Sequence, residues 1–402
     1  MIIYLSTAAS DEWQKRCNDK YATQPIVYVQ QRWDYTLCKS FRACWGEDFA
    51  AVSYPPIQTF PSGKCLFEKA YLEETDTMDT HYCGFINIPF MKQATSVRSV
   101  VKIIRKLMKN RQDQELTIIT HCFYPQSFYA VKALQKWYQV KVYTIIPDLP
   151  DFSYSNLNKK NKLLGLLWKR FNAMKQKLKG IPDGYICFSE RQRNYLDRSK
   201  PYIVMEGFAD IDYIDSIEEA KLASDKRIIM YAGALKQAYG VDDMVRAFME
   251  IGATDAELWI YGDGESREWI EKVSDSRVRY MGCVTRDEVV AVEKSVYALI
   301  NPRPAKEEYA KCSFPSKLLE YMATGTPVLT TRLESMPVEY TEKLMFIEDD
   351  SAEGIKKAMG ELLGMPYDSV HQYGVDARRF ICTYKTPLKQ ARTIQEFIER
   401  NG

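Results

Sequence analysis

A serine, a lysine and a glutamate near the carboxyl end of the chain have types and spacing that suit the binding of a phosphate and a sugar. Ser316, Lys317 and Glu320 fall on or near one face of a predicted helix. The first turn of a helix offers unpaired N–H groups and a positive dipole end, which attract phosphate. Lys317 would add a full charge, and Glu320 could accept hydrogen bonds from ribose hydroxyls. The pattern favours a nucleotide diphosphate attached to a sugar, although a solvated Lys–Glu pair has the same spacing.

The surrounding residues predict a strand–loop–helix–strand unit that would position this motif. The apolar run 297–300 indicates a buried strand. Ser313 is a plausible N-cap, and Pro315 suits the first helical turn because no amide hydrogen is needed there. Gly325 ends the helix, and 327–331 form the next strand. Such units build a parallel sheet with covering helices.

This segment resembles the signature of retaining glycosyltransferases of the group 1 type (family four), which have the GT-B fold. Those enzymes carry two glutamates separated by seven residues, then a small residue, Gly, a variable residue, Pro and Val. Glu320 matches the second glutamate and 323–328 match the tail, whereas the first glutamate position falls on Cys312. The Phe-Pro-Ser-Lys sequence at 314–317 resembles a subgroup common in bacterial surface-polysaccharide pathways.

The resemblance implies an α/β protein with two doubly wound Rossmann-like domains facing across a cleft. The first, at 1–207, would hold the acceptor, and the second, at 208–385, would bind the nucleotide-sugar, with a helix at 386–402 packing back on the first. The implied enzyme is a hexosyltransferase-like protein that moves a sugar from a nucleotide-sugar donor to a hydroxyl of a lipid-linked glycan. Its mechanism would retain the anomeric configuration, by substitution on the same face of the sugar.

The second half also departs from the family pattern where the diphosphate is expected. The segment 228–241 predicts a strand, a glycine turn and a helix, and it resembles the first unit of the family's second domain. That unit normally carries an Arg just after its first Gly and a Lys just before its second, positions that are Ala234 and Tyr239 here. Lys236 lies between them and could substitute. The donor-binding residues expected from the motif and the resemblance are Gly233, Lys236, Gly262, Gly282, Cys283, Ser313, Phe314, Pro315, Ser316, Lys317 and Glu320.

Two residues in the first half follow predicted strands at positions where open α/β sheets bind ligands. His121 follows the β-branched strand 116–120, and the family often places a histidine at this loop, near the donor sugar and the reacting centre. Asp148 follows the strand 140–146 and could contact an acceptor hydroxyl. A structural histidine and a turn aspartate between prolines are the alternatives.

Composition narrows the class of protein. The chain has 402 residues and a net charge of +2, which gives no argument for nucleic acid. Its ten cysteines contain no C-x-x-C pair and its three histidines are scattered, so we expect neither a disulfide framework nor a metal site or other cofactor. Neither a signal peptide nor an apolar run of membrane-spanning length is evident, which predicts a cytoplasmic protein.

The segment 159–179 carries eight basic residues and no acidic one, with apolar residues at helical spacing on one side. A basic amphipathic helix of this kind suits an anionic bilayer, although an ordinary outer helix packed on the sheet is the alternative. Membrane contact would place the protein peripherally at the inner face of the cell membrane, next to a lipid-linked acceptor.

Two further hypotheses remain open. Cys312, Ala234 and Tyr239 also fit a non-catalytic GT-B protein that stabilises or targets an active glycosyltransferase. A sugar-nucleotide epimerase would share the same fold. A dehydrogenase is rejected, because Arg267 occupies the third glycine position of the only partial dinucleotide fingerprint.

Overall fold

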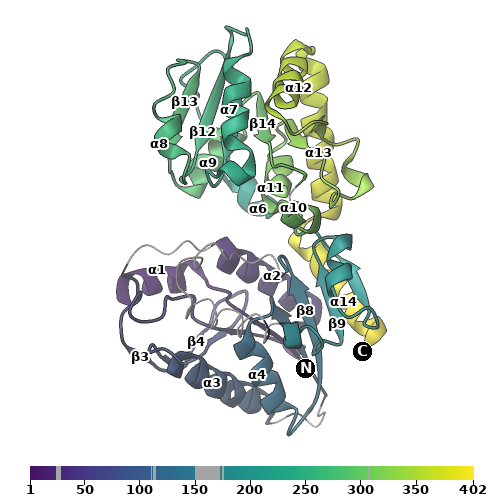
Figure 1. Cartoon of the computed structure of the whole chain (residues 1–402). Coiled ribbons are helices and arrows are strands. Elements are labelled where there is room, and N and C mark those ends of the chain that lie inside the picture. Colours follow the sequence, from purple (N-terminus) through teal and green to yellow (C-terminus); the bar gives the residue numbers. More distant parts are fainter. Residues whose placement is uncertain (24–28, 110, 112–114, 150–172, 174–175, 307) are drawn as a thin grey trace. The chain divides into compact units, whose positions relative to one another are not determined.

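The computed structural model describes residues 1–402 apart from 24–28, 110, 112–114, 150–172, 174–175 and 307. The chain divides into two compact units (Figure 1). Unit 1 consists of Met1–Met205 together with Pro387–Gly402, and unit 2 of Glu206–Thr386. The two are described separately below.

Unit 1 is built on an eight-stranded sheet in the order β10-β9-β8-β7-β1-β2-β5-β4. Neighbouring strands are parallel except for β4, which runs antiparallel to β5. The strands are β1 (Ile2–Ser6), β2 (Phe49–Ser53), β4 (Tyr71–Glu73), β5 (Thr80–Tyr82), β7 (Glu115–His121), β8 (Gln139–Ile146), β9 (Gly184–Cys187) and β10 (Tyr202–Val204), and β3 (Phe67–Glu68) and β6 (Phe85–Ile86) form a separate pair. The central strands are buried on both faces, as their apolar, β-branched sequences require.

Helices cover the sheet of unit 1. They are α1 (Asp11–Lys20), α2 (Val29–Trp45), α3 (Met91–Met108), α4 (Pro125–Leu134) and α14 (Pro387–Asn401), with short 3-10 turns η1 (Gly46–Asp48) and η3 (Glu190–Tyr195). The last helix of the chain, α14, packs against α2, and α3 packs against α4 (Figure 1). The apolar run 25–29 predicts a strand from its sequence. Residues 25–28 lie outside the described part of the chain, and Val29 begins α2, so at this residue the prediction is wrong.

Unit 2 has a six-stranded parallel sheet in the order β13-β12-β11-β14-β15-β16. Its strands are β11 (Arg227–Ala232), β12 (Ala256–Tyr261), β13 (Val278–Gly282), β14 (Ala298–Asn301), β15 (Val328–Thr331) and β16 (Met345–Ile347). Its helices are α6 (Ile211–Ser216), η4 (Gln237–Tyr239), α7 (Val241–Met249), α8 (Arg267–Ile270), α9 (Arg286–Glu293), α10 (Glu308–Cys312), α11 (Ser316–Thr324), η5 (Val338–Tyr340), α12 (Ala352–Gly364) and α13 (Tyr367–Tyr384). Alternate residues of β11 pack into two hydrophobic cores, one on each face of the sheet. Met230 belongs to one core and Ile229 to the other.

The strand orders define one switch point in each unit, where consecutive connections leave in opposite directions. It falls between β1 and β7 in unit 1 and between β11 and β14 in unit 2. In open α/β sheets ligands bind beside such points, at the carboxyl ends of the strands. The predicted α/β class with Rossmann-like parallel sheets is therefore confirmed, and its two switch points indicate where to look for a site.

The two chain segments that connect the units are fastened together inside unit 2. The Nζ of Lys385 donates to an Oε of Glu206 at 2.7 Å, and both side chains are buried. The amide of Ala209 donates to the carbonyl of Lys385 at 3.0 Å. The beginning and the end of unit 2 are thus held side by side.

Among the helices in the described part of the chain, none is long and apolar enough to cross a membrane.

Candidate functional site

The helix predicted to bind phosphate is α11, and it begins later than the sequence suggested. Its N-cap is Pro315, so the prediction of Ser313 as N-cap is wrong. The reason is Phe314, which is buried and packs against Tyr340 with ring centroids 5.2 Å apart, and this anchor holds the chain between α10 and α11 extended. The N-cap residue, a proline, provides no side-chain hydrogen bond to the start of α11. At its other end Gly325 has φ +84°, as the left-handed C-cap demands.

Tyr321 fixes α11 to the central strand of unit 2. Its hydroxyl accepts a hydrogen bond from the amide of Ala232 at 2.8 Å and donates to the carbonyl of the same residue at 3.1 Å. Tyr321 is fully buried, so these bonds are shielded from water. They place the first turns of α11 beside the carboxyl end of β11, next to the switch point.

Glu320 lies within a network of ion pairs on α9 and α11. The guanidinium of Arg286 donates to Oε2 of Glu320 at 2.7 Å, and Nζ of Lys317 donates to Oε1 at 2.9 Å. Burial alone would raise the pKa of Glu320, but the charges of Lys317 and Arg286 outweigh it and lower the pKa to about 2. Lys317 and Glu320 therefore do form an ion pair, as the alternative interpretation of the motif assumed. The pair is partly buried and Glu320 also binds Arg286, so it is not a simple solvated pair. Glu320 is an acceptor at any physiological pH.

Lys317 also forms an ion pair with a second, buried carboxylate. Its Nζ lies 2.9 Å from Oε1 of Glu293, the last residue of α9, whose side chain is inaccessible to solvent. Burial raises the pKa of Glu293 to about 7, against the lowering effect of Lys317. Arg286 stacks on the ring of Tyr213, with Cζ 4.0 Å from the centroid. These contacts fix two cations, Lys317 and Arg286, at defined positions beside the start of α11.

Two further cations meet at the switch point of unit 2. Lys236 Nζ and Arg303 Cζ lie 5.4 and 5.7 Å from the ring centroid of Tyr239, which stands where the family has a lysine. A guanidinium nitrogen of Arg303 also reaches Oγ of Ser313 at 3.5 Å. Gly240 allows this meeting, because a Cβ there would lie 2.2 Å from the carbonyl oxygen of Pro302 and because its φ is +75°. Lys236 and Arg303 therefore converge from the loops after β11 and β14.

The predicted glycines lie at the carboxyl ends of three neighbouring strands. Gly233 follows β11, Gly262 follows β12 and Gly282 ends β13. The amide of Gly262 donates to the carbonyl of Gly282 at 2.9 Å, and a Cβ on Gly262 would lie 1.9 Å from the carbonyl oxygen of Gly233. Backbone and not side chain therefore lines this edge. Cys283 is exposed just beyond it, and Ser316 is exposed at the first turn of α11.

The second candidate centre lies in unit 1, at the switch point between β1 and β7. His121 is the last residue of β7, not the first loop residue expected from the sequence. Its Nδ1 lies 2.5 Å from Oδ1 of Asp34, and the hydroxyl of Tyr4 donates to the same oxygen at 2.5 Å. The amide and hydroxyl of Thr7 donate to the other oxygen at 3.2 and 3.1 Å. Asp34 thus accepts bonds on both oxygens from residues of β1, the loop after it and β7.

This arrangement fixes the imidazole of His121. Burial disfavours its charged form, but the carboxylate of Asp34, with Cys122 beside it, outweighs burial and raises the pKa of His121 well above the ordinary value. The edge of the ring contacts Trp33 at a centroid distance of 5.4 Å. Within the described residues, Nε2 is buried and has no hydrogen-bond partner. His121 is therefore held with Nδ1 engaged and with its other ring nitrogen buried and unpaired within the described residues.

Other predicted residues are less informative. Asp148 lies in an exposed bend just after β8. Most of the basic segment 159–179 lies outside the described residues, and its described part, 173 and 176–179, ends in a helical turn with Leu178 buried. No group of three His, Cys, Asp or Glu side chains in the described part of the chain could hold a metal. The expectation that no metal takes part stays a prediction.

Sequence reasoning missed three residues of these centres: Asp34, Arg286 and Glu293. Asp34 lies on α2, 87 positions before His121, and no local pattern links the two. Arg286 opens α9 after Thr285, whose capping box with Glu288 is a recognisable signal for a helix start but not for a partner of Glu320. Glu293, at the end of the same helix, could have been noticed only as a charge in an apolar stretch.

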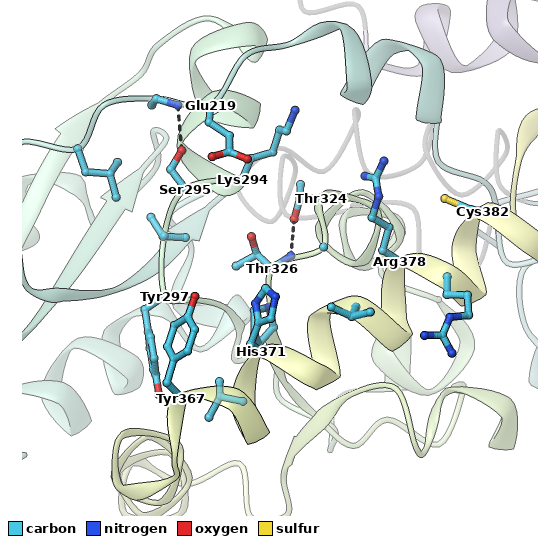
Figure 2. Close-up of a pocket in the computed structure, with 18 residues that line it drawn as sticks. Glu219, Lys294, Ser295, Tyr297, Thr324, Thr326, Tyr367, His371, Arg378 and Cys382 are labelled. Atoms are coloured by element: carbon cyan, nitrogen blue, oxygen red, sulfur yellow. Dashed lines mark hydrogen bonds between the residues drawn. The ribbon is translucent and has the colours of Figure 1, made fainter.

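A cavity of unit 2 lies elsewhere, at the amino ends of β14 and β15. Figure 2 shows Lys294, Tyr297 and His371 around this cavity of about 740 Å³. Lys294 donates to the carbonyl of Ile217 at 2.5 Å, and Arg378 bonds the carbonyl of Ala323, at the end of α11. Its principal cations therefore stabilise loop and helix ends. The carboxyl edge, with Glu320, remains the better candidate site.

Residues 226–365, most of unit 2, match the family model described as Glycosyl transferases group 1. The whole chain has the GT-B fold of known glycosyltransferase structures. A comparison with curated proteins returns no match.

Similar structures cover the chain from end to end at low identity. A sucrose-phosphate synthase from Thermosynechococcus elongatus is 13% identical, with a TM-score of 0.69 over 100% of this chain and 98% of that one. HepE of Anabaena in complex with UDP is 12% identical, with a TM-score of 0.61 and 99% coverage of both chains. The lipopolysaccharide outer core galactosyltransferase WaaB is 13% identical, with a TM-score of 0.61 and coverage of 100% and 99%.

Proposed function

We propose that this protein is a glycosyltransferase that moves a sugar from a nucleotide-sugar donor to a hydroxyl of a glycan, with retention of anomeric configuration. The observation that carries the proposal is the carboxyl edge of unit 2. There an uncapped helix start, the cations Lys236, Arg303 and Lys317, and the ionised Glu320 lie around one switch point. The match to the group 1 family over the same unit supports it.

The charges of this edge suit a departing nucleoside diphosphate. When the sugar–oxygen bond breaks, negative charge develops on the diphosphate, and fixed cations and helix N–H groups stabilise it without reorganising. Lys236, Arg303 and the first amides of α11 take this role in the proposal. Glu320 would accept hydrogen bonds from the ribose hydroxyls, exchanging its contact with Lys317 or Arg286 for the ligand. The leaving diphosphate would take the proton of the acceptor hydroxyl, so that the chain itself supplies positioning and charge.

His121 has a separate place in the proposal. Its Nδ1 is engaged by Asp34, so a protonated Nε2 would donate a hydrogen bond to an oxygen of the sugar substrate at the carboxyl edge of unit 1. Asp148, exposed beyond β8, would contact the acceptor. The acceptor class, a lipid-linked glycan of surface-polysaccharide synthesis, rests on the Phe-Pro-Ser-Lys resemblance. WaaB, a lipopolysaccharide galactosyltransferase, has a similar fold. A protein with this acceptor would work in the cytoplasm at the inner face of the membrane.

Calorimetry with UDP, GDP and their sugars tests the proposal, followed by mass spectrometry of each donor with and without glycan acceptors. We expect micromolar to millimolar binding of one nucleotide, slow donor hydrolysis and transfer to a suitable acceptor. Failure of every nucleotide to bind at millimolar concentration would contradict the proposal.

A non-catalytic GT-B partner protein is the second candidate, and one observation favours it. Cys312, which occupies the position of the family's first glutamate, is buried at 3% exposure and cannot hold a sugar as a carboxylate would. Nucleotide binding without hydrolysis or transfer, together with stable association with an active glycosyltransferase, would favour this alternative. Interconversion of free sugar nucleotides would instead point to an epimerase.

A further inference from the structure

The outer face formed by α3 and α4 in unit 1 is strongly basic. Between Asp79 and Asp148 the chain has ten Lys and Arg residues and only two acidic ones, Asp113 and Glu115, although the whole chain is nearly neutral. Neither α3 nor α4 contains any acidic residue. This stretch of unit 1 therefore carries a local excess of positive charge, as the segment 159–179 does, in a chain that is nearly neutral.

The cations of α3 lie along one exposed stripe. Its buried residues, Ser96, Val100, Ile104 and Met108, recur every four positions and face the unit. The exposed residues on the opposite side are Met91, Ala94, Arg98, Lys102, Arg105 and Lys106, with Lys109 directly after the helix. With a rise of about 1.5 Å per residue the stripe is roughly 27 Å long. Because α3 keeps its apolar side in the core, the stripe is available as a fixed row of charges.

Exposed apolar and aromatic side chains accompany these charges. Phe90, directly before α3, is 90% exposed and has φ +63°, a strained conformation for a bulky residue, and Met91 next to it is also exposed. Near the other end Trp137 is 44% exposed, and the guanidinium of Arg105 lies 4.4 Å from its ring centroid. Tyr129 on the adjacent α4 is exposed as well. A basic face that only contacts water would not require exposed apolar and aromatic side chains, so their presence indicates a binding surface.

We propose that this face, formed by α3, α4, Phe90 and Trp137, docks on an anionic phospholipid surface. Clustered Lys and Arg are attracted to acidic headgroups, each contributing about 1 kcal/mol near the surface. Trp and Tyr favour the boundary between headgroups and acyl chains, and an exposed Phe–Met tip gains by entering it. Nucleic acid would reward the charges and could stack on an aromatic ring, but it would not reward the exposed thioether side chain of Met91. The proposal does not require the segment 159–179 and holds whether or not the protein is a glycosyltransferase.

Vesicle flotation with the full chain tests this surface. Vesicles of phosphatidylcholine alone are compared with vesicles that also contain phosphatidylglycerol. The wild type is expected to float with the anionic vesicles only, and less so at high salt. The double variant R98Q/K102Q should lower the partition constant about thirtyfold, from about 1 kcal/mol for each cation. A matched control, K272Q/K357Q, removes the same charge from exposed positions of unit 2 and should float like the wild type.

A second variant separates a lipid surface from any other polyanion. F90S should lower binding to anionic vesicles about tenfold, because it removes the apolar side chain that enters the bilayer in the proposal, and should leave binding to heparin unchanged. All substituted residues are exposed, so circular dichroism should show unchanged folding. Equal flotation of R98Q/K102Q and the wild type would overturn the proposal. So would an F90S variant with unchanged flotation, or a loss of flotation that follows only from neutralising 159–179.

Discussion

The carboxyl edges of the two sheets use charge in different ways. In unit 2 the cations Lys317 and Arg286 keep about a third of their side-chain surface exposed and share the carboxylate of Glu320. In unit 1 the ion pair of His121 and Asp34 is buried almost completely, with Tyr4 and Thr7 closing it in. In the first edge the cations are partly exposed, so a ligand can reach them, although Glu320 is held by two ion pairs. The second is a fixed support in which the remaining ring nitrogen of His121 is buried.

The largest effect should come from breaking the buried pair. Asp34→Asn leaves the imidazole of His121 without its counter-charge in a dry environment, and we expect the free energy of unfolding of unit 1 to fall by about 3–5 kcal/mol. Urea denaturation at neutral pH measures it. Asp11→Asn, at an exposed position of the same unit, should change stability by no more than about 0.5 kcal/mol. Equal stability of both variants would remove the contrast between the two edges.

The second largest effect concerns the pH dependence of the stability of unit 2, which depends on Glu293. The pKa of Glu293 is raised to about 7 from 4.5, so its folded form binds a proton more tightly than the unfolded chain. Its contribution is present below about pH 4.5 and is lost as pH rises to about 7, in total about 3 kcal/mol. Glu293→Gln should flatten this decline in the unfolding transition of unit 2. Glu361→Gln, which is exposed, should leave the decline unchanged.

Glu320→Ala tests whether the carboxylate of unit 2 can turn to a ligand. Removal of a charge-assisted contact to ribose should weaken nucleotide binding by about 1–3 kcal/mol, measured by calorimetry. Glu361→Ala on the exposed face of α12 is the control. Unchanged affinity of the Glu320 variant would mean that the ion pairs with Arg286 and Lys317 are its whole purpose.

The smallest expected effect concerns one cation at the switch point. Lys236→Gln should weaken binding of a nucleoside diphosphate about tenfold and binding of the free nucleoside hardly at all, because only the former has phosphate oxygens to contact. Lys272→Gln is the matched control. A uniform loss for both ligands would indicate that Lys236 maintains the loop around Tyr239 and does not bind phosphate.

The sequence predicted best where the structure is decided locally. The strand–helix–strand unit around α11 and its end at Gly325 follow from patterns within short windows, and the GT-B fold was implied by the resemblance to the group 1 signature. The cap at Ser313 was wrong because burial of Phe314 against a distant tyrosine decides where the helix begins. The pair of Asp34 and His121 forms only when distant segments come together in the folded unit, and so does the pair of Lys317 and Glu293. No rule based on sequence spacing could have predicted either pair. Whether the predicted site residues bind a donor stays a prediction.

Lys385 is bonded to both Glu206 and Ala209, so the two ends of unit 2 are joined. This has a practical consequence for producing the units separately. Unit 2 is one uninterrupted segment, 206–386, inserted before the final helix of unit 1. A gene fragment encoding this segment keeps the bonds that join its two ends, and it should yield a protein that folds alone. Truncation after 386 would instead strip α14 from the helix it covers, α2, which also carries Asp34. The minimal form of unit 1 is therefore a permuted or spliced chain, with 205 and 387 joined by a short linker.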